Sequence, residues 1–199
     1  FSCSIGDDED GHLFLDSYSD KQKVFYNFSE EPTGVCLVFI TPDGERTMAS
    51  NLSANYKLNP QCINSELLES CNYLLFDNFS LATNSGNKTA HYCLGNIKNE
   101  VKVCFGLADS KLVSENLDKI QDLSNKTIHC LSGNKQEHDE LDKNISLSFQ
   151  NRLISNGVNG ASINGIQISA PKIKLVNTNG AGDSLIGAYI ALEEEIGQE

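Results

Sequence analysis

From residue 61 onward, short apolar runs alternate with segments whose apolar residues recur at helical spacing. The runs typical of strands are YLLFDN at 73–78, VKVCFGL at 101–107, TIHCLSG at 127–133 and NRLIS at 151–155. Strands and helices in alternating order form a mostly parallel sheet with helices on both faces. The sequence therefore predicts an α/β fold, with a hairpin-rich β segment at 157–176.

Helices are expected between these strands. The clearest is SKLVSENLDKIQDL at 110–123, where apolar residues at 112, 113, 117, 120 and 123 lie on one helical face. Further helices are predicted around 64–71, in the stretch before residue 100, and from about residue 135.

The N-terminal part indicates antiparallel β structure instead. Strands are expected at 23–28, 34–41 and 45–51, and the last two flank Pro42-Asp43-Gly44. An Asp-Gly step favours a tight hairpin turn. We therefore expect one α/β domain over residues 1–199 with a small β lid inserted over about residues 23–51.

The charge of the chain and the length of its apolar runs exclude two classes of partner. Among 199 residues, 15 Lys and Arg stand against 27 Asp and Glu, which gives a formal net charge of −12. A protein that binds nucleic acid through its phosphates needs a basic face, so no nucleic-acid partner is expected. The longest apolar runs, such as VCLVFI at 35–40, are too short to cross a bilayer, so no membrane partner is expected either.

The seven cysteines favour a reducing compartment, because they form no C-x-x-C pair and their odd number leaves one unpaired. We expect a cytoplasmic protein in which Cys36, Cys104 and Cys130 act as small apolar residues within strands. The four scattered His residues do not have zinc-ligand spacing. Six N-x-S/T sequons, against roughly three expected by chance, leave a secreted glycoprotein as the alternative.

The segment NTNGAGDSLIGAYIALEEE at 177–195 contains the strongest candidate for chemistry. Gly180, Ala181 and Gly182 directly precede an apolar helical pattern, so their N–H groups are expected at a helix N-terminus, which attracts anions. Asp183 at this positive end would stay ionised and could accept a proton from a substrate hydroxyl. The alternative is a glycine-rich loop with a capping aspartate.

Five segments in order resemble the ribokinase-like family of sugar and nucleoside kinases, the phosphofructokinase B type. NTNGAGDSLIGAYI at 177–190 is similar to the family signature D-T-x-G-A-G-D, which is followed by a helix. IGDDEDG at 5–11 is similar to the family's V-G-D-D-x-x-G segment, and TGVCLVFITPDGERTMASNLSANYKL at 33–58 is similar to the lid strands of adenosine kinase and related bacterial sugar kinases. Further along the chain, GNKQE at 133–137 is similar to the N-x-x-E motif, and SNGVNGASI at 155–163 is similar to T-x-G-x-x-G.

This resemblance implies a ribokinase-like three-layer sandwich with a β lid, and an enzyme that transfers the γ-phosphate of ATP to a hydroxyl of a sugar or nucleoside. Asp183 would then be the catalytic base that activates the acceptor hydroxyl. The amides of Gly180, Ala181 and Gly182 would form an anion hole that stabilises charge on the transferring phosphoryl group.

The resemblance also implies the residues around the cofactors. Glu137, with Asn134, would act on Mg²⁺ through bound water, which suits an ion that keeps its waters. The nucleotide would lie against Ser155, Gly157, Gly160 and Asn179. The alternatives are a solvated helix start for Asn134 and Glu137, and an ordinary turn for the two glycines.

In the lid, the resemblance implies that Arg46 approaches the phosphates when the lid closes, and that the lid forms a homodimer contact through its apolar run at 35–40. The alternative for Arg46 is an exposed edge-strand charge that discourages aggregation.

The sequence also departs from the family pattern. Asn177 stands where the family usually has an Asp of a monovalent-cation site, so potassium activation is not carried over. No segment matches the family's opening G-G-x-x-x-N region or its closing helices, so we expect a chain truncated at both ends. Two hypotheses follow: part of an ATP-dependent kinase, or a non-catalytic relative that acts as a nucleotide-binding or structural module.

Overall fold

The computed structural model describes residues 1–18, 23–42, 46–174 and 178–196. The chain divides into two compact units. The first comprises Phe1–Ser70 and Thr83–Ile97, and the second comprises Cys71–Ala82 and Lys98–Glu199. The expectation of one domain with a lid over residues 23–51 stays a prediction.

The second unit is built on a six-stranded sheet. Its strands, in spatial order, are β10 (Ile166–Ile168), β9 (Ala161–Ile163), β8 (Phe149–Ser155), β7 (Ile128–Asn134), β6 (Lys102–Gly106) and β5 (Tyr73–Asp77). Strands β5 to β8 are parallel to one another, and β9 and β10 continue the sheet as antiparallel strands. The predicted mostly parallel sheet is confirmed, and the segment 157–176 contributes its antiparallel end.

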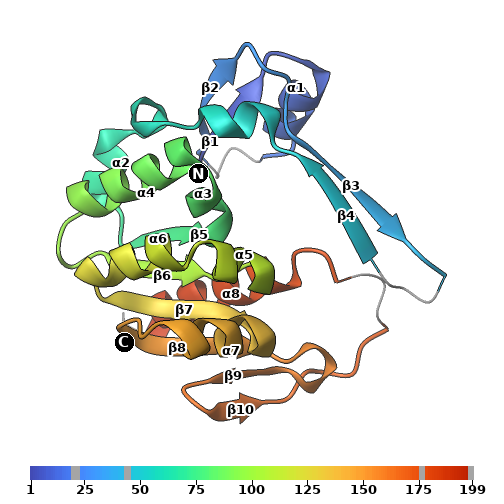
Figure 1. Ribbon diagram of the computed structural model, residues 1–199, viewed down its shortest axis with the longest axis vertical. Helices are drawn as coiled ribbons and strands as arrows, with labels where there is room; N and C mark the ends of the chain where they lie inside the picture. The colour runs from blue at the N-terminus through green and yellow to red at the C-terminus, as the bar shows by residue number, and fades with distance from the viewer. Residues whose placement is uncertain (19–22, 43–45, 175–177, 197–199) are drawn as a thin grey trace. The chain divides into compact units, whose positions relative to one another are not determined.

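Helices cover both faces of this sheet (Figure 1). On one face lies α8 (Ala181–Ile196), whose Ile186 packs with Cys104, Cys130 and Leu153. On the other face lie α5 (Ser110–Glu115), α6 (Leu117–Asp122) and α7 (Lys135–Asn144). The short elements of this unit are α3 (Asn78–Ala82), η3 (Leu123–Asn125) and η4 (Gly157–Asn159).

The single helix predicted over residues 110–123 is interrupted at Asn116. This residue lies between α5 and α6 with φ −112° and ψ 15°. Its buried amide donates to Asn78 Oδ1 at 3.0 Å, and Lys119 Nζ donates to Asn116 Oδ1 at 3.2 Å. A side chain that bonds to a neighbouring element competes with helical geometry at its own backbone. The predicted apolar face is nevertheless used, since Val113 and Ile120 are fully buried.

The first unit contains two small sheets. Strand β1 (Ser2–Gly6) pairs in parallel with β2 (Phe25–Ser29), and β3 (Val35–Ile40) pairs with β4 (Arg46–Asn51) in the antiparallel manner predicted for the hairpin. The strand predicted at 23–28 therefore pairs with β1 and not with the hairpin. The Asp43-Gly44 turn itself lies outside the described residues. The remaining elements are α1 (Glu9–Asp16), η1 (Ser53–Lys57), η2 (Pro60–Cys62), α2 (Ser65–Ser70) and α4 (Asn84–Asn96).

The IGDDEDG segment forms a tight strand-to-helix turn in this unit. Asp8 caps α1 by accepting from Gly11 N at 2.9 Å, and it also accepts from Thr33 N at 2.7 Å and from Thr33 Oγ1 at 2.6 Å. These hydrogen bonds lower the pKa of Asp8. A Cβ at Gly11 would lie 2.3 Å from the carbonyl oxygen of Gly6, so the close approach of backbone to backbone requires glycine there.

The three cysteines predicted to act as small apolar residues differ in burial. Cys104 and Cys130 are completely buried, as expected. Cys36 lies in a strand as predicted, but its side chain is exposed like every other side chain of β3. The prediction that it acts as a small apolar residue was therefore wrong. Within the described ranges, no helix has the length and apolarity needed to span a bilayer.

Candidate active site

Two of the predicted site residues lie where parallel strands end. Asn134 is the last residue of β7 and Ser155 is the last residue of β8, and the two are directly paired across the ladder. Asp77 ends β5 opposite Gly106 of β6. Because all four parallel strands point the same way, these residues share the carboxyl edge of the sheet, which is where open α/β sheets bind ligands.

The start of α8 has the backbone geometry that its sequence predicts. Gly180 has φ +68°, a left-handed conformation that favours glycine, and Ser184 N donates to its carbonyl oxygen at 2.8 Å. The first N–H groups of a helix have no acceptor within the helix. A Cβ at Gly182 would meet no heavy atom within 4 Å, so open space lies in front of this backbone. Asp183 is exposed in the same turn.

The structure adds Asp77 to this group. Its carboxylate is half-buried and accepts from Ser80 N at 3.1 Å and Ser80 Oγ at 3.3 Å. Burial raises the pKa of Asp77, and the nearby negative charge of Asp183 raises it further, against the opposing effect of the Ser80 hydrogen bonds. The start of α8 therefore lies close to the carboxyl end of β5.

Asn134 and Glu137 form a closed capping box at the start of α7. Asn134 Oδ1 accepts from Glu137 N at 3.0 Å, while the Glu137 carboxylate accepts from Asn134 N at 2.9 Å and from Asn134 Nδ2 at 2.6 Å. Glu137 is buried, so the alternative of a solvated helix start is wrong for its side chain. Burial raises the pKa of Glu137, the Asn134 N–H opposes this, and the charge of Asp109 adds to it.

Ser155, Gly157 and Gly160 lie on the turn that joins β8 to β9. Gly160 has φ +93°, and a Cβ there would lie 2.0 Å from the carbonyl oxygen of Ile168, so local packing alone requires this glycine. Gly157 has φ +55°, and a Cβ there would meet nothing within 4 Å. Backbone conformation therefore explains the glycine at 157. No other part of the described structure packs against the turn at this position.

The remaining predicted residues are less well placed. Asn179 is exposed just before α8. Arg46 begins β4 opposite Ile40 in the first unit, and its side chain lies outside the described part of the structure. Asn177, the departure from the family signature, lies outside the described residues as well.

Two carboxylates were missed by the sequence analysis. Asp77 is the last residue of β5, and Asp109 follows β6 by three residues. Each comes just after an apolar run, in YLLFDN and VKVCFGLAD, and acidic residues at the ends of parallel strands are a usable signal. In the portion of the chain that the structure describes, no three His, Cys, Asp or Glu side chains converge on a metal site.

Comparisons with known proteins identify the family of this chain. The sequence profile described as pfkB family carbohydrate kinase matches residues 1–192. The chain belongs to this family. No curated protein sequence matches the pfkB-family chain. Many solved structures are similar to it. The sequence identity of those named below is about a fifth or less, so they establish only the fold.

Three of those structures illustrate the likeness. Adenosine kinase from Sinorhizobium meliloti has TM-score 0.77 and 19% identity over 92% of this chain and 62% of its own. Adenosine kinase from Schistosoma mansoni, in complex with 2-fluoroadenosine, has TM-score 0.77 and 21% identity over 99% of this chain and 67% of its own. A sugar kinase from Pyrococcus horikoshii in complex with ATP has TM-score 0.79 and 16% identity over 95% of this chain and 67% of its own. The chain thus spans 62% of the first of these relatives.

Proposed function

We propose that this chain forms the phosphoryl-transfer part of an ATP-dependent kinase that acts on a hydroxyl of a sugar or nucleoside. The observation that carries the proposal is the start of α8, where an exposed Asp183 stands in the first helical turn behind the left-handed Gly180, with open space around Gly182. The family supports the reaction class, since its members are described as carbohydrate kinases.

In the proposed mechanism, Asp183 accepts the proton of the acceptor hydroxyl while the hydroxyl oxygen attacks the γ-phosphorus of ATP. The bond from that phosphorus to the β-phosphate oxygen breaks, and ADP leaves. The amides of Gly180, Ala181 and Gly182 donate to the phosphoryl oxygens, where negative charge accumulates, and the Ala181 N–H gives up its long 3.3 Å hydrogen bond to the carbonyl oxygen of Thr178 to do so. Preoriented backbone amides at a helix start suit this role because they need little rearrangement during the reaction.

The nucleotide and metal would be ATP and Mg²⁺. Structures similar to this chain hold them, including an Escherichia coli protein assigned as a ribokinase II in complex with ATP and Mg²⁺. Mg²⁺ prefers oxygen ligands and keeps several waters, so a single carboxylate that acts through water fits the ion without a converging cluster. Glu137 fits this description, because its oxygens keep lone pairs beyond those used by Asn134. The ion would neutralise charge on the phosphates.

The nucleotide would follow the carboxyl edge of the sheet from Asn134 and Ser155 to the turn at Gly157 and Gly160, with Asn179 beside it. The acceptor would be a small sugar or nucleoside, because the relatives include adenosine kinases and sugar kinases. Arg46 would approach the phosphates from the lid. We further propose a homodimer through the hairpin β3–β4, whose Leu37, Phe39, Ile40 and Met48 side chains are all more than half exposed.

Nucleotide binding is tested by thermal unfolding of the full-length protein with and without millimolar Mg-ATP. A ligand at about 100 times its Kd stabilises the folded state by about 2.7 kcal/mol, so Tm should rise. Gly182→Val places a branched side chain in front of the amides and should remove this rise. Gly187→Val is the matched control, because a Cβ there also meets nothing within 4 Å but lies one and a half turns further along α8.

An equal rise in all three proteins would contradict the placement of ATP at Gly182. The absence of a rise in the parent protein would contradict nucleotide binding altogether. A rise in the parent without phosphoryl transfer would instead support the non-catalytic alternative.

A further inference from the structure

Helix α8 is attached to the sheet by a narrow stripe of side chains. Residues 185, 186, 189, 190 and 193 recur at helical spacing, and the first four are the apolar members Leu185, Ile186, Tyr189 and Ile190. Only Ile186 among them is buried, and the whole first turn of the helix is exposed. The turn that carries Gly182 and Asp183 therefore depends for its position on contacts made further along the helix.

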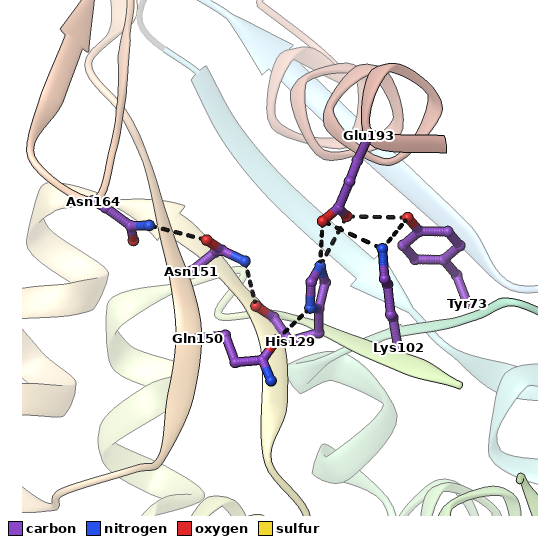
Figure 2. A network of polar contacts seen from close by, with 7 residues as sticks. All are labelled: Tyr73, Lys102, His129, Gln150, Asn151, Asn164 and Glu193. Atoms are coloured by element: carbon purple, nitrogen blue, oxygen red, sulfur yellow. Dashed lines mark hydrogen bonds and ion pairs between the residues drawn. The ribbon is translucent and has the colours of Figure 1, made fainter. Parts of the chain in front are cut away.

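The last position of the stripe is a carboxylate, Glu193, in a polar cluster (Figure 2). Tyr73 Oη donates to Glu193 Oε2 at 3.0 Å, and His129 Nε2 lies 2.9 Å and 2.8 Å from the two carboxylate oxygens. Lys102 Nζ lies 3.4 Å from Glu193 Oε1 and donates to Tyr73 Oη at 3.1 Å. One side chain of α8 is thus bound to three adjacent strands, β5, β6 and β7.

The partners of Glu193 are themselves held in place. His129 Nδ1 lies 2.7 Å from Gln150 Oε1 of β8, and Asn151 Nδ2 donates to the carbonyl oxygen of His129 at 3.2 Å. Asn164 Nδ2 in turn donates to Asn151 Oδ1 at 2.9 Å. The cluster therefore extends as a hydrogen-bonded network across the sheet, and the helix is attached to it.

The charges in the cluster favour an ionised Glu193. Burial opposes ionisation, but hydrogen bonds from His129 and Tyr73 and the charges of His129 and Lys102 outweigh it, so the pKa of Glu193 lies below its ordinary value. Hydrogen bonds to an ionised group are shorter and stronger than those between neutral groups. A glutamine of nearly the same shape would lose much of this attachment.

We propose that Glu193 is a positioning residue: by binding Tyr73, Lys102 and His129 it fixes the orientation of α8, and thereby the position of Asp183 at the other end of the helix. This inference rests on the proposed function of Asp183. Ten residues separate the two carboxylates, which is about 15 Å along a helix. A small tilt about Ile186 therefore displaces the first turn, and a displacement of about 1 Å can cost about 10²-fold in rate.

The test compares Glu193→Gln with Glu195→Gln in the full-length protein. Glu195 lies on the same helix and is exposed, so the control makes the same chemical change outside the cluster. Amide hydrogen exchange of Ser184 to Gly187 is measured by NMR without substrate. The values of kcat and KM are measured with ATP and with whichever of adenosine, ribose and fructose the parent protein phosphorylates. Glu193→Gln should speed this exchange about tenfold and lower kcat about tenfold, with KM for ATP within about twofold. Glu195→Gln should leave all three unchanged.

Unchanged exchange at Ser184 to Gly187 in Glu193→Gln would overturn the inference whatever the activity shows. Faster exchange with unchanged kcat would also overturn it, because α8 would then be attached but not positioned for the reaction. If the parent protein has no kinase activity, the proposed function fails, and the exchange measurement separately decides whether Glu193 holds the helix. Should Glu193→Gln not fold, Tyr73→Phe removes one donor and keeps the ring. Its exchange should be about threefold faster, and unchanged exchange in this variant would overturn the inference as well.

Discussion

Strands β3 and β6 have similar sequences and opposite environments. VCLVFI in β3 and KVCFG in β6 are both apolar and both contain one cysteine. Phe39 of β3 is 57% exposed and Phe105 of β6 is 0% exposed. Apolar character favours a strand in both places, but it does not determine whether anything covers that strand. Strand β6 is covered by α5 and α6 on one face of the sheet and by α8 on the other, whereas β3, within the described residues, pairs only with its hairpin partner β4.

The comparison predicts unequal losses of stability on removing the two phenylalanines. Phe105→Ala should lower the free energy of unfolding by about 3–5 kcal/mol, because it removes buried contacts and leaves a cavity. At a concentration at which the chain is monomeric, Phe39→Ala should change it by no more than about 0.5 kcal/mol, because the exposed ring of the monomer has few contacts to lose. Urea unfolding of both variants measures the difference, and similar losses would mean that β3 is covered in solution.

The cysteines of the two strands should differ in reactivity. Burial raises the pKa of Cys104 and of Cys130 to about 12, so almost no thiolate forms at pH 8, and neither sulfur is accessible. Cys36 is exposed. A maleimide followed by peptide mass spectrometry should label Cys36 at least about 100-fold faster than Cys104. Equal rates would show that the sheet of the second unit opens readily.

The exposed hairpin should matter for association. Leu37 and Phe39 alternate along β3 and share one face of it. If the proposed dimer uses this face, Leu37→Ser with Phe39→Ser should raise its dissociation constant by about tenfold or more, because each side chain loses apolar burial. Ile166→Ser with Ile168→Ser, on exposed β10, is the control and should leave association unchanged. Light scattering that shows only monomer in the parent protein would contradict the dimer.

A smaller difference is expected between the carboxylates at the two strand ends, Asp8 and Asp77. The pKa of Asp8 is lowered, so its stabilising effect is present above pH 3.8, the ordinary value, and is lost as the pH falls through the lower folded value. The pKa of Asp77 is raised, so the folded state loses stability as the pH rises from 3.8 through the folded value. At pH 7, Asp8→Asn should lower the urea midpoint and Asp77→Asn should raise it slightly. Both effects should shrink below pH 3. A raised midpoint in Asp8→Asn or a lowered midpoint in Asp77→Asn at pH 7 would contradict the assignment.

Local sequence pattern was enough for the parallel sheet. The alternation of apolar runs with amphipathic segments gave β5 to β8 and the helices between them, since period and order are properties of neighbouring residues. It did not give the break at Asn116, because that break comes from a hydrogen bond with Asn78, 38 residues away. Nor did it give the pairing of β2 with β1, because a strand's partner is a non-local choice.

The candidate site likewise has features that local sequence predicts and features that depend on residues distant in the chain. The glycines and Asp183 at the start of α8 were predictable, because backbone conformation and helix ends follow from local residues. Burial of Glu137 in a capping box, and the proximity of Asp77 to Asp183, were not predictable, because both depend on how separate strand ends meet at one edge of the sheet. The network around Glu193 was missed for the same reason, since it joins residues 64 and 120 positions apart.

The most direct test of the proposed function is the turnover of Asp183→Asn in the full-length protein, with Asp118→Asn as the control. Asp118 is an exposed aspartate in the first turn of α6, so the control makes the same change at another helix start. Asp183→Asn should lower kcat about 10²- to 10⁴-fold and leave ATP affinity almost unchanged, because it removes the proton acceptor and keeps the neighbouring amides. Asp118→Asn should turn over like the parent. Near-parental turnover of Asp183→Asn at saturating substrate would contradict its role as the base.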